Sequence, residues 1–134
     1  MPDSSLARRL TEIDGAIADW ERRIAGAETV PVGEAVEAAV RAAHDLVRAY
    51  LQAEGGKPVP GADVDLLEAF RLLAKGDPSW NAIRENLREL VYYRNCVTLG
   101  RRDALPAVPE RMAVRLARHV FLYLKTRCER EGRL

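Results

Sequence analysis

The sequence holds few residues suited to metal or redox chemistry. It has two cysteines, Cys96 and Cys128, and two histidines, His44 and His119, and these four match no metal-ligand spacing. It also has no glycine-rich phosphate loop and no serine or cysteine in a known nucleophile motif. We therefore expect no metal site, no cofactor, and two reduced, semi-buried thiols.

Long apolar runs are absent as well. No uninterrupted hydrophobic segment approaches the ~18 residues that a transmembrane helix needs, and the first ten residues lack the apolar core of a secretory signal. We expect a cytoplasmic protein that does not span a membrane.

Aromatic residues make up only 6% of the chain, whereas 20 of its 134 residues are alanine. Alanine is the strongest helix former, and runs of β-branched residues are scarce. This composition predicts an all-α fold, and the length fits one domain covering residues 1–134.

Five segments repeat apolar residues at helical spacing. The first, ending near Gly26, predicts one narrow buried stripe made of Leu6, Leu10, Ile13, Ile17, Trp20 and Ile24. The second is expected to start near Pro31 and to end at Gly55-Gly56, with an inward face made of Val36, Ala39, Val40, Ala43, Val47, Tyr50 and Leu51.

The third helix is short, with Asp63 as its expected cap, Gly76 as its stop, and Leu66, Leu67, Phe70 and Leu73 packing inward. The fourth opens at Asp77-Pro78 and buries Trp80, Ile83, Leu87, Leu90 and Val91. The fifth runs from Pro109 to about Glu131 and carries Met112, Leu116, Val120, Tyr123 and Leu124 inward. Short connections favour antiparallel neighbours, so we predict an up-down bundle of about five helices.

Arg94 is the most informative candidate for a binding site. It falls at the angular centre of the apolar stripe of the fourth helix, where an arginine must reach solvent, pair with an acid, or face a cleft or second subunit. Tyr92, Tyr93 and Asn95 surround it with hydrogen-bonding groups. Two interpretations stay open: the four residues line a cleft or interface, or the helix end frays and Arg94 only reaches solvent.

The remaining polar candidates lie on helix flanks. His44 and His119 each flank an apolar face, which is typical of surface or boundary histidines, although the two could meet across the bundle. Arg111, Arg115, Arg118 and Lys125 share a sector of the fifth helix about 80° wide. We expect this sector to lie opposite the apolar face, either as a solvated surface or as a contact for a phosphate backbone.

The segments of residues 35–131 follow one another in a distinctive order. An alanine-rich run over 42–51 leads to Glu54-Gly55. A proline-containing loop, a short leucine-rich helix, the Tyr-Tyr-Arg-Asn segment and a long final helix come after it. In this order and in the helix that leads to a glycine, the chain resembles a HEPN-type domain (higher eukaryotes and prokaryotes nucleotide-binding). The resemblance implies a four- or five-helix bundle that dimerises, often as a toxin of a toxin–antitoxin pair or another defence RNase.

The family's active motif is an arginine, often followed by asparagine, with a histidine after four to six further residues. Arg94-Asn95 matches the first half, but Leu99, Gly100 and Arg101 occupy the positions where the histidine is expected. In active members the resemblance implies metal-independent RNA cleavage in which the histidine moves protons and the arginine stabilises phosphate. Leucine cannot accept a proton, so we expect no catalytic residue at this motif.

Three hypotheses follow. The first is a non-catalytic HEPN-like binding protein, a regulator, antitoxin-like partner or adaptor, acting as a homodimer on a protein partner or RNA. The second is an RNase with a divergent site, in which Arg94 is kept and His44 or His119 replaces the missing base. The third is an unrelated helical scaffold subunit of a nucleoprotein or phage assembly.

Overall fold

The computed structural model describes residues 4–26, 29–55 and 58–134 and contains five α-helices. They are α1 (Ser4–Ala25), α2 (Val32–Glu54), α3 (Leu66–Ala74), α4 (Asn81–Thr98) and α5 (Pro109–Arg130), joined in part by 3-10 turns at Pro78–Trp80 and Arg102–Ala104. No strand occurs in these three segments. The predicted all-α class and the five-helix bundle are therefore confirmed; Gly56, part of the predicted end of the second helix, lies outside the described residues.

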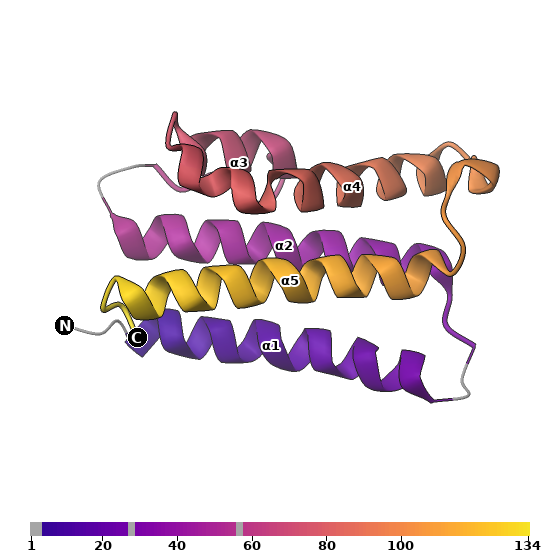
Figure 1. Ribbon diagram of the computed structural model, residues 1–134, viewed down its shortest axis with the longest axis horizontal. Helices are drawn as coiled ribbons and strands as arrows, with labels where there is room; N and C mark the ends of the chain where they lie inside the picture. Colours follow the sequence, from indigo (N-terminus) through magenta and orange to yellow (C-terminus); the bar gives the residue numbers. More distant parts are fainter. Residues whose placement is uncertain (1–3, 27–28, 56–57) are drawn as a thin grey trace.

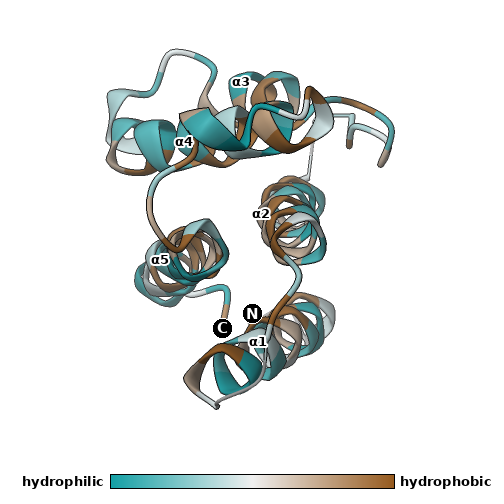
Figure 2. Cartoon of the chain, turned by 90° about the vertical axis from the view of Figure 1, so that its right-hand side faces the viewer, coloured by the Kyte–Doolittle hydropathy of each residue, from teal (hydrophilic) through white to brown (hydrophobic). Residues whose placement is uncertain are grey.

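The helices form three layers. Figure 1 shows α3 and α4 above, α2 and α5 in the middle, and α1 below, with α1, α2, α4 and α5 alternating in direction along the chain. Figure 2 looks from the right-hand side of that view and shows α2 and α5 side by side between the other two layers. The predicted up-down order is confirmed.

Alanine makes the central pair of helices possible. Ala35, Ala39 and Ala43 of α2 and Ala113 and Ala117 of α5 are at most 3% exposed. A methyl side chain lets two helix backbones approach closely without loss of packing density. All seven apolar residues predicted to face inward from α2 are buried.

The stripe of α1 is buried for most of its length. Leu6, Leu10, Ile13 and Ile17 are buried in the core, but Trp20 and Ile24 are only partly buried. The guanidinium of Arg23 lies 4.3 Å from the centre of the Trp20 ring. The prediction that Trp20 fills a buried site is therefore only partly right, because the end of α1 packs less closely.

The predicted cap of α3 is wrong. Asp65, not Asp63, precedes the helix, and its carboxylate accepts a hydrogen bond from the Leu67 amide at 3.2 Å. Asp63 lies two residues too early to reach the free amides of the first turn. The five apolar residues predicted for the buried face of the fourth segment are all buried, including Trp80 in the turn before α4.

The predicted inward face of α5 needs a correction. Met112, Leu116 and Tyr123 are only partly buried, whereas Val114 and Phe121 are buried. The reason is that α5 contacts α1 as well as α2 and α4, which turns the buried sector toward the α1 side. Cys96 and Cys128 are free thiols and more deeply buried than expected, at 5% and 1% exposure.

Candidate functional site

Arg94 pairs with an acid from another helix. Its Nη2 lies 2.8 Å from Oδ1 of Asp65, the residue that caps α3. The other carboxylate oxygen of Asp65 accepts from the Leu67 amide, so both oxygens are used. The hydrogen bond from Arg94 lowers the pKa of Asp65 below its usual value. The ion pair between Arg94 and Asp65 therefore links the start of α3 to α4.

His44 lies beside this pair, and within the expected choice of surface or boundary residue it is the more buried, boundary kind. It is 8% exposed, and its Nε2 lies 2.6 Å from the carbonyl oxygen of Val64. A carbonyl can only accept, so Nε2 carries the hydrogen and Nδ1 is left as the ring atom that can take a proton. The sequence could not show this because Val64 belongs to the loop before α3, which covers this side of α2. His119 is exposed, as predicted.

His44 and Arg94 line one cleft of about 350 Å³ between α2, α4 and the loop before α3. Two guanidinium groups, Arg41 and Arg94, border it together with four carboxylates, Glu37, Asp45, Asp63 and Asp65. With more acids than bases, the cleft disfavours a nucleic-acid phosphate. The cleft holds one histidine, and the arginine beside it already bonds to a carboxylate.

The four neighbouring candidates on α4 point in different directions. Tyr93 is 4% exposed, and its hydroxyl donates to Glu89 at 3.3 Å. Tyr92 is 49% exposed, and its hydroxyl donates to the carbonyl of Ala104 at 2.9 Å. Asn95 is exposed. The structure thus brings Arg94 to the cleft and places Tyr92 and Asn95 on the outer face of α4.

Two large apolar side chains are exposed at the two ends of the connection between α4 and α5. Leu99, the C-cap residue that directly follows α4, is 74% exposed. This is the highest value among the large hydrophobic residues of the described segments. Val108, directly before α5, is 44% exposed. At 100° per residue, Tyr92, Asn95 and Leu99 fall within a sector about 60° wide. We call Tyr92, Asn95, Leu99 and Val108 the α4–α5 patch.

The backbone of this connection is held in a defined shape. Gly100, with φ of 69°, ends α4, and the amides of Gly100 and Arg101 bond to the carbonyls of Val97 and Cys96. Val108 has φ of 51° and ψ of 58°, a left-handed conformation that a β-branched residue rarely adopts. Such a conformation costs about 1–2 kcal/mol relative to an ordinary one. A valine that is exposed and held in this conformation does not stabilise the fold through its side chain, so we infer that it has another role.

The arginines predicted to share a solvated sector of α5 do not share one environment. Arg118 is partly buried and bonds to Asp14 at 2.6 Å and to Glu21 at 2.8 Å, so it joins α5 to α1. The expectation that it lies opposite the apolar face was wrong, because α1 covers that flank. Arg111 and Arg115 are exposed, line a hollow of about 380 Å³ together with Arg118, and make no ion pair with any described residue. Lys125 is exposed too.

A second polar cluster, which the sequence did not indicate, joins the end of α5 to the end of α2 and to the turn before α4. The Arg127 guanidinium lies 3.9 Å from the centre of the Trp80 ring and bonds to Ser79, Asp77 and Glu131. The hydroxyl of Tyr50 donates to Glu131 at 2.8 Å, and burial raises its pKa to about 12. Every charge in this cluster has a partner, which is typical of a structural clamp.

The described segments hold no group of three or more histidine, cysteine or acidic residues placed to bind a metal ion. No helix within them combines the length and the apolar character that crossing a bilayer requires. Comparison of the chain with protein-family models, with curated proteins and with solved structures finds no match.

Proposed function

We propose that this chain is a non-catalytic, HEPN-like binding protein that pairs with a second copy of itself through the α4–α5 patch. The observation that carries the proposal is Leu99. It stands where the family's motif has its histidine at the shortest spacing, and it presents an apolar side chain that is 74% exposed. A large exposed apolar group at such a position is better suited to an interface than to chemistry.

The lack of catalysis rests on the partners of Arg94. Nη2 of Arg94 bonds to Asp65, and this carboxylate competes with a phosphate for the same cation. The four carboxylates of the cleft add repulsion against RNA. An all-α bundle that has the arginine of the motif and lacks its histidine fits the role of a regulator or adaptor.

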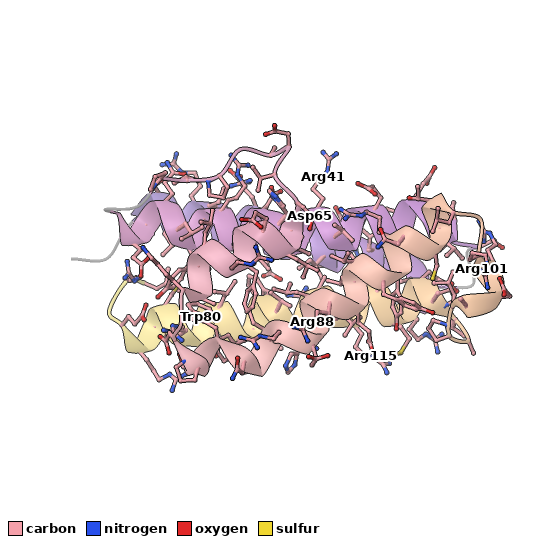
Figure 3. All side chains as sticks on the ribbon, turned by 90° about the horizontal axis from the view of Figure 1, so that it is seen from above. Arg41, Asp65, Trp80, Arg88, Arg101 and Arg115 are labelled. Atoms are coloured by element: carbon pink, nitrogen blue, oxygen red, sulfur yellow. The ribbon has the colours of Figure 1, made fainter. Side chains whose placement is uncertain are left out.

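The choice of a second copy rests on the charges around the patch. At one end Arg88 pairs with Glu85, and at the other Arg101 pairs with Asp103. Figure 3 labels Arg88, which lies within α4, and Arg101, which lies just beyond its end. An apolar centre bordered by both signs of charge is complementary to itself under a two-fold rotation, as a symmetric dimer requires.

Sedimentation velocity tests the proposal. The wild-type protein should sediment near twice 14.9 kDa at micromolar concentration. Leu99→Asp places a charge in the centre of the interface and should give a monomer with unchanged helical circular dichroism. Leu72→Asp is the matched control, since Leu72 is an exposed leucine on α3, and it should remain dimeric. A monomeric wild type, or a dimer in Leu99→Asp, contradicts the proposal.

One observation favours the RNase as a second candidate: Arg94 and His44 line the same cleft. A metal-free cleavage assay on single-stranded RNA separates the two functions. The RNase predicts cleavage that falls by ~10²–10⁴-fold in His44→Ala, as loss of a general base does. His119→Ala is the matched control on the exposed histidine. The non-catalytic protein predicts background rates in the wild type and in both variants.

A further inference from the structure

A groove separate from the α4–α5 patch and from the cleft opens between α1 and α2. Its volume is about 280 Å³, comparable to that of about nine water molecules in the liquid. The α2 wall is made of Ala38, Ala39 and Ala42, and the floor is made of Val114 and Ala117 of α5. The short alanine side chains on this side of α2 leave part of the space beside α1 open.

The α1 wall is larger and apolar. Ile13 and Ile17 are at most 4% exposed, and Trp20 is half-buried at the same groove. The groove therefore reaches through the outer layer of helices to the central one. Apolar walls with a few polar groups at the mouth are the usual composition of a small-molecule site.

Among the residues that the structure describes, one cation at the mouth has no ion-pair partner. Arg9 lies 3.3 Å from Glu12 and 3.5 Å from Asp45, so these three groups hold one another. Arg41 is exposed and makes no ion pair or hydrogen bond with any described residue. Figure 3 shows its side chain projecting away from α2, toward solvent. Arg41 borders both this groove and the cleft.

We propose that the groove between α1 and α2 binds a small amphipathic anion, a compact apolar body carrying one carboxylate or sulfonate group. The apolar body lies on the alanines of α2 against Ile13, Ile17 and Trp20. The anionic group lies at the mouth, where Arg41 is the guanidinium available to pair with it. The ligand remains noncovalent, and the site is independent of the dimer interface.

Fluorescence titration with anilinonaphthalene sulfonate, an aromatic anion, tests this inference alongside its neutral relative N-phenylnaphthylamine. The native protein should bind one sulfonate per chain, and octanoate should compete for the site. Arg41→Gln should weaken sulfonate binding about fivefold and leave the neutral dye unchanged, as loss of one exposed ion pair does. Arg130→Gln, which removes another exposed arginine, should bind both dyes like the wild type.

Filling the groove provides the second arm. Ala38→Phe from the α2 wall and Ala16→Phe from the α1 wall each place a ring in the groove without replacing a fully buried side chain. Either variant should weaken both dyes tenfold or more. Leu99→Asp should keep wild-type affinity, because the dye does not bind the α4–α5 patch. No saturable binding, wild-type affinity in the filled variants, or equal effects of Arg41→Gln on both dyes would overturn the inference.

Discussion

Val108 offers a direct test of whether the α4–α5 connection is built for folding alone. In ordinary positions glycine is less stable than alanine by about 0.5–1 kcal/mol, because it loses more backbone freedom on folding. At φ of 51° an alanine keeps the left-handed strain of about 1–2 kcal/mol and a glycine does not. Both variants remove the two γ-methyl groups of Val108 and differ by one β-carbon, so their difference reports mainly on the backbone.

At position 108 we therefore expect glycine to be more stable than alanine, the reverse of their usual order. Val108→Gly should be more stable than Val108→Ala by about 0.5–1 kcal/mol, or roughly 2–5 °C in melting temperature for a chain of this size. Urea unfolding followed by circular dichroism measures it, at concentrations where all samples are monomeric. Both variants should also dimerise more weakly, since each lacks the valine side chain. If alanine proves equal to or better than glycine, the reasoning about strain at Val108 is refuted.

Two further predictions concern the fold that carries the site. Asp65→Asn keeps the cap of α3 but removes the charge that Arg94 binds, at a cost of up to about 1 kcal/mol near neutral pH for a partly exposed pair. Because Arg94 lowers the pKa of Asp65, this stability is present above the usual pKa of 3.8 and is lost as the pH falls through the lower folded value. Wild type and variant should then converge in acid urea titrations, and a constant gap would contradict the assignment. Trp80→Ala should cost ~3–5 kcal/mol, because that ring is 2% exposed, whereas Trp20→Ala should cost about half as much or less. Equal losses in urea unfolding would show that Trp20 is buried as well.

Periodicity predicted the helices well because it depends on local spacing. The strict stripe of α1 and the alanine-rich face of α2 specify which side of each helix is buried, whatever their partners are. The inward face of α5 was harder to predict. Its buried sector depends on three neighbouring helices, and no pattern within α5 records where α1 packs.

The candidate site shows the same limit in its polar residues. The sequence singled out Arg94, but its partner Asp65 lies 29 positions earlier, on another element. Arg118 resembled a solvated arginine because Asp14 and Glu21 lie about a hundred positions away. A single sequence does not show which distant residues form an ion pair. Arg94 and Arg118 could therefore be recognised as candidates, but their partners could not be predicted.

The exposure of Leu99 could not be interpreted from the sequence alone. Leu99 follows the apolar stripe of α4 on its polar side, and a single leucine facing solvent is common in proteins. Whether Leu99 belongs to an interface depends on whether Val108 and Tyr92 are exposed too, and their exposure is known only from the structure.

The most direct test of the central claim is a cross-link through the α4–α5 patch. Asn95→Cys, made in a chain whose buried Cys96 and Cys128 are replaced by alanine, places one exposed thiol on the patch and leaves Leu99 intact. A symmetric dimer brings the two thiols close together, so oxidation or a short bismaleimide should give a species near twice 14.9 kDa. Leu72→Cys in the same background should stay uncross-linked at equal concentration. Cross-linking at both positions alike, or at neither, would contradict a homodimer formed through this patch.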